Sequence, residues 1–513
     1  MKNRMQKKFY LTTAIDYVNG APHIGHAVQK VWADIIARYH RLLGEKVWFL
    51  TGTDEHGANV VRTAASAGKS PKELADENSA KFRNFKEALN LSWDDFIRTS
   101  DEARHWPGVQ EFWKRLTEAG DIYKSDYRGL YCLGHEAFIT EKDLVDGKCK
   151  LHGREPEAIN EENYFFRLSK YSGEIKERIR SGELQILPES RKNEILSLLE
   201  EGLEDVSFSR PSKDISWGVP VPGDATQTVY VWAEALINYL SAVGYGRNDD
   251  WQGWWPADLH VFGKDNLRFH AAIWPGMLMS AKLSLPRMLL CHGFIQVGGR
   301  KMSKTLGNVV DPFEIVKNFG TDALRYYFSR EITIFEDGDF TEERFGETYE
   351  ANLVNGLGNY VRRVATMIKN DFGGQLERPA QEKIDSVPLQ KGELEYVSVP
   401  YFTDHVAWPE YHRAMENFEI NRAADITFNL IKELDGYVQR YEPFKLVKTD
   451  QEKARAVLWN LAYGAVSLAW MLSPFLPETS GKILDIFGAE GERESEWKRF
   501  VVKDRPPLFP RIP

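Results

Sequence analysis

A strand-like stretch, Phe9-Tyr10-Leu11-Thr12-Thr13-Ala14-Ile15, leads into the turn Ala21-Pro22-His23-Ile24-Gly25-His26. Aromatic and β-branched residues suit a buried strand. After the turn, apolar residues recur three or four positions apart, which predicts a helix packed on a sheet. Gly25 lets the backbone approach a ligand closely, and a helix start favours an anion. His23 and His26 therefore indicate a phosphate site, although a lone His-x-x-His is more often a pair of ordinary capping residues.

Length and composition limit the classes of protein to which the chain can belong. Its 513 residues predict two to four domains. The net charge of −9 means that a nucleic-acid partner would have to meet a local basic surface. Only three cysteines are present, which is typical of a reducing compartment and leads us to expect a cytoplasmic protein.

One uncharged segment, from Ala456 to Pro477, is long enough to span a bilayer. It contains several polar residues and Pro474, and no second span accompanies it. These features favour a buried helix of an α-helical domain over a membrane span, so we expect no membrane association.

Strands and helices alternate over residues 1 to about 116, which predicts a parallel sheet. The periodicity weakens from Asp121 to about Asp224, as in an inserted domain. Further strands of the same sheet are expected at Val47–Thr51, Gln227–Trp232, Leu259–Gly263 and Met288–Phe294. After about Thr341 amphipathic helices dominate, joined by a polar linker at residues 373–394.

Two Cys/His pairs with matching spacing lie in the expected insertion. They are Cys132 with His135 and, after thirteen intervening residues, Cys149 with His152. Two thiolates and two imidazoles can close a tetrahedron around Zn²⁺, and four protein ligands would make the site structural. The alternative is two unrelated surface pairs, but the use of two of three cysteines in matched pairs favours zinc.

A glycine-rich basic stretch, Gly298 to Asn308, follows the last expected strand. Its glycines predict a mobile loop, and the ammonium groups of Lys301 and Lys304 can reach one polyphosphate from the same side. By itself such a stretch would be a solvated charge run. Together with the His-x-x-His helix start on the same sheet, it indicates a nucleotide site.

The two motifs His23-Ile24-Gly25-His26 and Lys301-Met302-Ser303-Lys304-Thr305 resemble the two signatures of class I aminoacyl-tRNA synthetases. Thr305 departs from the usual serine but keeps the hydroxyl group. The resemblance runs over nearly the whole chain and is closest to the methionyl-tRNA synthetases. Other matching stretches are Asn19–Pro22, Thr51–Gly57, Tyr230–Trp232, Gly263–Asp265, Phe269–His270 and Leu306–Pro312.

The resemblance implies ATP-dependent activation of methionine, followed by transfer to the terminal adenosine of a tRNA. The carboxylate of the amino acid attacks the α-phosphate, so catalysis consists of alignment and charge stabilisation. His23 and His26 are then assigned to the ATP phosphates, Lys301 and Lys304 to the departing pyrophosphate, and Mg²⁺ is expected to bridge the phosphates. Gly25 and Ser303 complete the ATP-binding set, with Gly263 and Asp265 beside the adenosine.

By the same resemblance, Asp54 holds the α-amino group of methionine. An aromatic-rich lining suits its thioether. That lining is expected from Ile15, Tyr17, Trp232, Tyr239, Phe269 and His270. Asp16 stands where an apolar or aromatic residue is frequent in the family, and Leu236 where proline occurs in some members. For Trp232 and Tyr239, an ordinary role as core aromatics stays an alternative.

The resemblance also assigns the insertion and the helical end. The family's connective domain carries zinc knuckles, mostly with Cys ligands, so His135 and His152 are departures. The helical end is expected to bind the anticodon through Asn359 and Arg363, one helical turn apart, and through Phe444, where a stacking Trp is common. The chain ends at Pro513 without the dimer-forming domain of some relatives, so we expect a monomer.

The resulting fold prediction is a Rossmann-type parallel sheet split by a zinc-knuckle insertion and followed by an all-α anticodon-binding domain. The expected divisions are 1–116 and 226–294 for the two halves of the catalytic domain, 117–225 for the insertion, 295–345 for the mobile-loop and stem-contact region, and 346–513 for the anticodon-binding domain.

Three other functions are compatible with parts of the sequence. They are a ligase for cysteine or another small apolar amino acid, a zinc-bearing RNA-binding protein without catalysis, and a nucleotidyltransferase that uses no tRNA. The His and Lys signatures speak against the second, and the long helical end speaks against the third.

Overall fold

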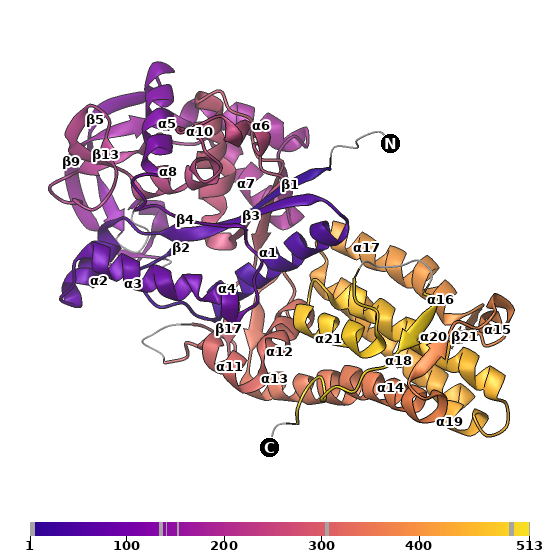
Figure 1. The fold of residues 1–513 in the computed structure, drawn as a ribbon. Helices are drawn as coiled ribbons and strands as arrows, with labels where there is room; N and C mark the ends of the chain where they lie inside the picture. The colour runs from indigo at the N-terminus through magenta and orange to yellow at the C-terminus, as the bar shows by residue number, and fades with distance from the viewer. Residues whose placement is uncertain are drawn as a thin grey trace. The chain divides into compact units, whose positions relative to one another are not determined.

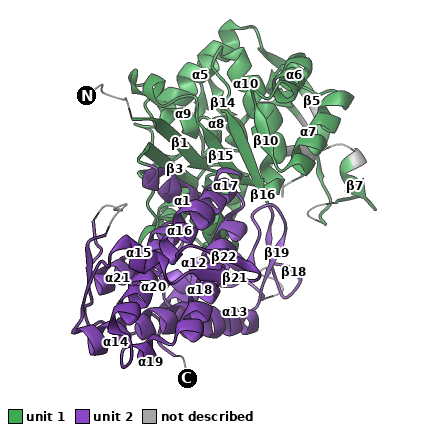
Figure 2. Ribbon diagram, turned by 90° about the vertical axis from the view of Figure 1, so that its right-hand side faces the viewer, with its two compact units in different colours: residues 1–33, 44–87, 91–292 green, residues 34–43, 88–90, 293–513 purple. Residues whose placement is uncertain are grey.

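The computed structural model describes residues 6–132, 137–139, 141–150, 153–302, 307–491 and 497–511. It divides into two compact units, drawn in different colours in Figure 2. Unit 1 comprises Met1–Ala33, Gly44–Glu87 and Leu91–His292, and unit 2 comprises Asp34–Leu43, Ala88–Asn90 and Gly293–Pro513.

The centre of unit 1 is a seven-stranded sheet in which every described pairing is parallel. Its strand order is β10-β16-β15-β1-β3-β2, with β4 also on β3. The strands are β1 (Lys8–Thr13), β2 (Asp16–Tyr17), β3 (Lys46–Asp54), β4 (Asp95–Arg98), β10 (Gln185–Leu187), β15 (Leu259–Gly263) and β16 (Met288–His292). The apolar stretch at the start of the chain lies in the middle, because β1 has β15 on one side and β3, labelled next to it in Figure 1, on the other. This confirms the predicted parallel sheet.

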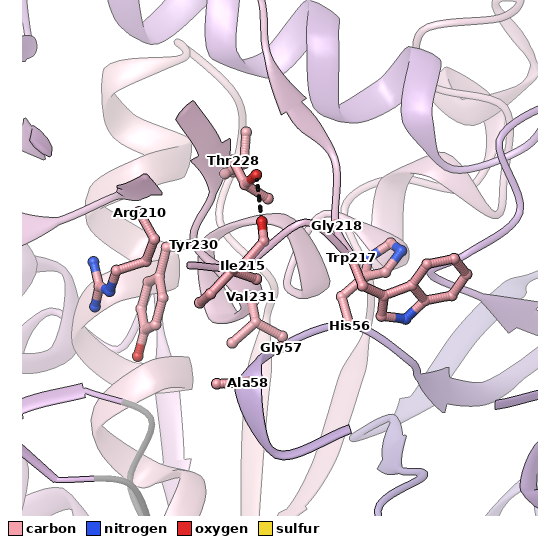
Figure 3. Close-up of a pocket in the computed structure, with 11 residues that line it drawn as sticks. His56, Gly57, Ala58, Arg210, Ile215, Trp217, Gly218, Thr228, Tyr230 and Val231 are labelled. Atoms are coloured by element: carbon pink, nitrogen blue, oxygen red, sulfur yellow. Dashed lines mark hydrogen bonds between the residues drawn. The ribbon is translucent and has the colours of Figure 1, made fainter. Parts of the chain in front are cut away.

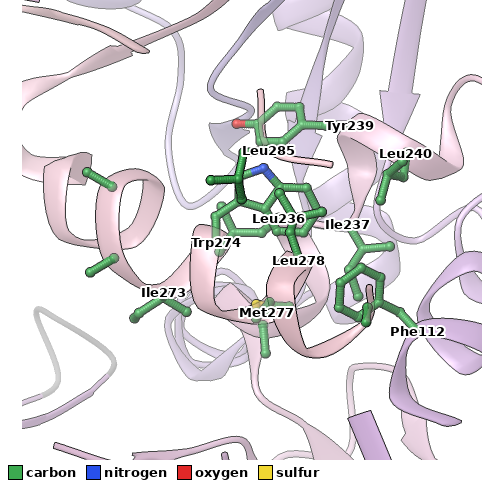
Figure 4. Close-up of a cluster of buried hydrophobic side chains, with 14 of the residues drawn as sticks. Phe112, Leu236, Ile237, Tyr239, Leu240, Ile273, Trp274, Met277, Leu278 and Leu285 are labelled. Atoms are coloured by element: carbon green, nitrogen blue, oxygen red, sulfur yellow. The ribbon is translucent and has the colours of Figure 1, made fainter. Parts of the chain in front are cut away.

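Helix α1 (Ile24–Leu42) follows the central strand, as its apolar period predicts. Further helices of unit 1 are α2 (Ala58–Ser66), α3 (Pro71–Arg83), α4 (Phe85–Ala88), α5 (Trp106–Glu118), α6 (Ser172–Arg180), α7 (Glu189–Glu201), α8 (Val231–Ala235), α9 (Asn238–Ser241) and α10 (Trp274–Ser280). The α5, α9 and α10 regions share a large apolar core, part of which Figure 4 shows. Phe112 stacks there on Trp274 with ring centroids 5.8 Å apart.

The middle of the chain differs from the sequence prediction in two places. Residues 227–232 are not a strand of the parallel sheet: β14 (Asp224–Val229) ends earlier and pairs antiparallel with β12 (Ser209–Pro211) and β13 (Pro220–Val221). Trp232 therefore lies in a helix, α8. Conversely, β10 comes from inside the expected insertion and pairs with β16 at the edge of the main sheet. Three residues are too few to show a strand period, so only the pairing partner reveals β10.

The rest of the expected insertion is antiparallel. Its larger sheet has the order β11-β9-β5-β6, and a separate hairpin pairs β7 with β8. The strands are β5 (Ile122–Cys132), β6 (Ala137–Ile139), β7 (Leu144–Val145), β8 (Lys148–Cys149), β9 (Glu157–Phe166) and β11 (Val206–Ser207).

The part of unit 2 from Gly293 onward starts with a small sheet, β18-β17-β19, and continues mainly as helices. These elements are β17 (Ile295–Val297), β18 (Arg300–Lys301), β19 (Gly338–Phe340), α11 (Pro312–Phe319), α12 (Thr321–Tyr326), α13 (Glu342–Thr348), α14 (Asn359–Phe372), α17 (Trp408–Glu416), α18 (Ile420–Tyr441), α19 (Pro443–Leu446), α20 (Gln451–Leu472) and α21 (Pro477–Phe487). The helical C-terminal region is confirmed.

The polar segment 373–394 is not a plain linker. It contains β20 (Gln375–Glu377), α15 (Gln381–Asp385) and β21 (Leu389–Lys391), with β22 (Leu394–Tyr396) and α16 (Val399–Phe402) following. β20 pairs with β23 (Arg499–Val501), a partner more than a hundred residues away that local sequence does not reveal. The uncharged segment lies mostly in α20, where its residues are buried apart from Trp470, and among the described helices none could cross a membrane.

Candidate active site

The His23–His26 turn opens α1 with both imidazole rings in defined hydrogen bonds. The backbone N–H of His23 donates to Nδ1 of His26 at 3.2 Å, and that of Gly25 donates to Nδ1 of His23 at 3.1 Å. An Nδ1 that accepts carries no proton, so each neutral ring has its proton on Nε2. The two rings are tilted together, with centroids 3.9 Å apart. The turn thus holds two N–H donors of the kind that bind a phosphate.

The environment keeps His26 uncharged. Burial, together with the nearby Lys30 ammonium, lowers the pKa of His26 to about 3. The ring therefore acts as a neutral donor at neutral pH.

Lys30, which the sequence analysis did not single out, lies one turn after His26 and is almost fully buried. Its Nζ donates to Thr13 Oγ1 at 3.0 Å, to the Ala14 carbonyl at 2.9 Å and to Gln29 Oε1 at 2.9 Å. Nζ also lies 3.0 Å from Oδ2 of Asp16, which is equally enclosed. The unusual acid at position 16 is the sequence signal that could have identified Lys30, because a buried carboxylate requires a buried cation.

Asp54 ends β3 and is 5% exposed. Tyr17 is its register partner in β2, and the N–H of Val18 donates to the Asp54 carbonyl at 3.1 Å. Asp54 and Tyr17, both expected at the methionine site, are therefore neighbours at the carboxyl edge of the sheet, where α/β folds bind ligands.

Tyr239 and His270 form a buried hydrogen-bonded pair. Nδ1 of His270 lies 3.0 Å from the carbonyl of Asn266, which can only accept, so Nδ1 carries the proton. Nε2 of His270 must then accept from the Tyr239 hydroxyl at 2.8 Å. Burial lowers the pKa of His270 to about 4, which keeps this tautomer neutral.

Trp232 and Phe269 stack face to face, with centroids 3.8 Å apart and an interplanar angle of 10°. Both side chains are half-buried, as is Ile15. Leu236, the other departure from the family, is 2% exposed and belongs to the core beneath them (Figure 4). The structure thus joins the expected aromatic residues into two pairs, Trp232–Phe269 and Tyr239–His270.

A buried network that sequence reasoning missed lies beside Trp232. Glu234 accepts from Nδ1 of His56 and from Nε2 of His105, each at 2.8 Å. Burial disfavours the charged carboxylate, but the two imidazoles lower the pKa of Glu234 overall. His56 also lines a cavity of about 10 Å³, room for about one water molecule, together with Trp217 and Tyr230 (Figure 3).

Those of the remaining ATP-binding candidates that the structure describes lie at or near strand ends. Gly263 ends β15 and is buried, and Asp265 follows it on an exposed turn. Lys301 is exposed in β18, where its Nζ lies 6.0 Å from the centroid of the Phe294 ring. Ser303 and Lys304 lie outside the described residues.

The three anticodon candidates differ in how they are held. Asn359 is exposed at the first residue of α14, and Phe444 is 48% exposed in α19. Arg363 is half-buried and pairs with Asp435 of α18. Burial raises the pKa of Asp435, and Arg363 opposes this shift.

Of the four predicted zinc ligands, Cys132 and Cys149 are described, whereas His135 and His152 lie outside the described residues. Both thiols are 1% exposed and share one small buried cluster with Ile139. Within the described ranges, no group of three or more potential ligands is arranged around a metal.

Two family models match the chain. The model for tRNA synthetases class I (M) matches residues 9–143 and 139–365, and that for the anticodon-binding domain of methionyl tRNA ligase matches residues 391–504. Together the two matches cover most of the chain. The chain is a class I aminoacyl-tRNA synthetase.

Individual relatives narrow the class. The chain is 42% identical to the methionine–tRNA ligase of Thermotoga maritima over 93% of its own length and 74% of that protein. It is 40% identical to that of Brucella melitensis over 95% and 93%, respectively. Methionyl-tRNA synthetase from Mycobacterium tuberculosis, solved with methionyl-adenylate, superposes with a TM-score of 0.91 at 36% identity, covering 99% of this chain and all of that one. The chain belongs to the methionyl-tRNA synthetase family.

Proposed function

We propose that this chain forms methionyl-adenylate from methionine and ATP and transfers the methionine to the terminal adenosine of tRNA. The observation that carries the proposal is the pair of neutral imidazoles at the start of α1, each with its proton on Nε2. Charge grows on the phosphates as the methionine carboxylate attacks, and preorganised N–H donors stabilise it at no cost of rearrangement.

Each step needs alignment rather than a protein nucleophile. His23 and His26 hold the ATP phosphates, and Lys301 with Lys304 neutralises the departing pyrophosphate. Mg²⁺ bound with ATP would neutralise part of the charge on its phosphates. Gly263 and Asp265 lie along the adenosine, with Asp265 near the ribose.

Methionine binds at the carboxyl edge of the sheet. Asp54 pairs with its α-amino group, and the stacked Trp232–Phe269 pair with Ile15 and Tyr17 surrounds the thioether. Hydrogen bonds orient Tyr239 and His270. Neither residue therefore presents an unsatisfied charge to the apolar side chain of the bound methionine.

The tRNA anticodon binds at the helical domain. Phe444, exposed on a short helix, stacks on one base, and Asn359 reads base edges. Arg363 contributes its remaining donors while Asp435 holds its guanidinium in place.

A structural Zn²⁺ is held by Cys132, His135, Cys149 and His152. The two thiols support this assignment because both are buried in one cluster at the ends of β5 and β8, a donor set that suits zinc. Metal analysis of the purified protein should find one zinc per chain, and Cys132→Ser with Cys149→Ser should abolish it. Absence of metal from the unmodified protein would contradict the site.

ATP–pyrophosphate exchange across single amino acids tests the activity. We expect exchange with methionine, and exchange with cysteine alone would refute the proposal. Charging of purified tRNA separates a ligase from a nucleotidyltransferase, and an RNA-binding protein without catalysis would show no exchange. Lys304→Ala should slow adenylate formation far more than it weakens methionine binding.

The chain is further proposed to act as a cytoplasmic monomer. Light scattering of the purified protein measures the mass of the particle, and a mass of twice 59.0 kDa would contradict this part of the proposal.

A further inference from the structure

One buried ammonium group, that of Lys30, contacts the segment that follows β1 and leads to the proposed methionine site. Lys30 Nζ contacts Thr13 Oγ1 and the Ala14 carbonyl, and it lies 3.0 Å from Asp16 Oδ2. Asp16 and Tyr17 then form β2 in parallel register with Thr53 and Asp54. Successive side chains of a strand point to opposite faces, so the side chain of Asp16 that meets Lys30 leaves Tyr17 on the other face.

Stability alone does not account for a buried pair of this kind. Taking two opposite charges out of water costs about as much as their attraction returns, and an apolar pair of similar volume is often as stable. The Lys30 and Asp16 side chains are 2% and 7% exposed, so each is almost completely desolvated. The Lys30–Asp16 pair instead fixes the positions of the chain segments that it joins.

Two parts of the active site are attached to this pair. Lys30 lies four residues after His26 on α1, so its contacts join the first turns of that helix to the end of β1. At the other end of the segment, Val18 bonds to the Asp54 carbonyl and accepts from Nδ2 of Asn78 at 2.8 Å. Ile15 and Tyr17 lie between these two anchors.

We propose that Lys30 and Asp16 are positioning residues for the methionine site, an inference that rests on the proposed function. The ion pair sets the path of residues 14–17 and thereby the positions of Ile15 and Tyr17 relative to Asp54. A small displacement of a group that binds a substrate can weaken catalysis or binding strongly. Loss of the pair should therefore weaken mainly the binding of methionine.

Three variants test this role: Lys30→Met, Asp16→Asn and the double variant Asp16→Leu with Lys30→Met. Each single variant leaves one buried charge or polar group without its partner, so we expect a lower melting temperature and a KM for methionine raised about tenfold or more. The double variant should recover most of the melting temperature while its KM for methionine stays raised and its KM for ATP changes less than about twofold. Recovery of the methionine KM in the double variant would overturn the positioning role, as would unchanged KM values in the single variants.

Arg325→Met provides a matched control. Arg325 forms an equally buried pair with Asp34 in unit 2, and its other contacts are the carbonyls of Leu89, Asn90, Pro474 and Phe475. This variant should lower the melting temperature without raising the KM for methionine. A similar rise in KM there would show that the effect follows from lost stability and would overturn the inference.

The readout separates this inference from the proposed function. An unmodified chain with no methionine-dependent exchange contradicts the proposed function. If the unmodified chain shows normal exchange and the double variant has the same KM for methionine, only the positioning role is contradicted. Should a single variant fail to fold, the double variant decides the question.

Discussion

The Tyr239–His270 hydrogen bond shows how one residue can matter through the group it satisfies. The Tyr239 hydroxyl is the donor to a buried Nε2 whose ring is already fixed by the Asn266 carbonyl. Without that donor the imidazole would either keep an unsatisfied buried nitrogen or take up a proton in an apolar site, and both are unfavourable.

Tyr239→Phe should therefore lower the free energy of unfolding by about 1–3 kcal/mol, as expected when a buried acceptor loses its only partner. Urea denaturation measures the change. The control is Tyr245→Phe, because the buried Tyr245 hydroxyl has no hydrogen-bond partner among the described residues. Removal of that hydroxyl should be neutral or stabilising, and equal losses in the two variants would contradict the role of the hydrogen bond.

Strand β3 is packed so closely that one of its positions has no room for a side chain. A Cβ at Gly52 would lie 2.0 Å from the backbone oxygen of Ile97, which belongs to the adjacent strand β4. The neighbouring residues Thr51 and Thr53 are fully buried, so the strand has no direction in which to move.

Gly52→Ala should destabilise the protein strongly, by several kcal/mol on the scale of an overpacked core. The matched control is Gly436→Ala on the exposed side of α18, where nothing lies within 4 Å of the added carbon. That variant should gain roughly 0.5–1 kcal/mol, because alanine is the better helix former. Thermal unfolding of both variants checks the pair, and a neutral Gly52→Ala would show that the two strands can separate.

Helix α19 carries the exposed Phe444, which we propose stacks on an anticodon base. Phe444→Ala should raise the KM for tRNA by roughly 10- to 100-fold, from the loss of about 1–3 kcal/mol of base stacking. Methionine-dependent exchange without tRNA should be unchanged, and Phe444→Trp should bind tRNA at least as well as the unmodified chain. An unchanged KM for tRNA in Phe444→Ala would remove this residue from the anticodon site.

At the scale of the whole molecule, the neutral histidines His26 and His270 make stability depend on pH. Burial lowers the pKa of His270 to about 4 and, with Lys30, that of His26 to about 3, whereas both titrate near 6.5 in the unfolded chain. Between these values the unfolded chain binds protons that the folded chain does not. The free energy of unfolding should therefore fall as the pH is lowered from about 6.5 to about 4, by about 1.4 kcal/mol per pH unit for each such histidine.

Denaturant titrations at a series of pH values check this dependence. His270→Gln should show a shallower slope than the unmodified chain over the same range, since it lacks one of the titrating groups. Identical slopes would mean that His270 takes up its proton in the folded state as well.

Local pattern alone determined much of this protein. The apolar stretch at β1, the helical period of α1 and the buried, uncharged part of α20 from Ala456 onward are all visible in sequence, because each is set by residues close together in the chain. The two spaced signatures also identify the family from the sequence alone. The binding of ATP phosphates and pyrophosphate by the two signature motifs stays a prediction from that resemblance.

Tertiary structure decided the features that depend on partners distant in sequence. It shows that β14 does not belong to the parallel sheet and that β10 does, since a strand is assigned to a sheet by the strand with which it pairs. It also assigned the tautomers of His23, His26 and His270, which follow from the group facing each ring nitrogen. At Asp16 the sequence presented an acid in an apolar context, and only the fold supplied its buried counter-ion, Lys30. The physical reason is the same in each case: burial and pairing belong to the three-dimensional arrangement, and a side chain's charge, proton and position are set by the groups that surround it.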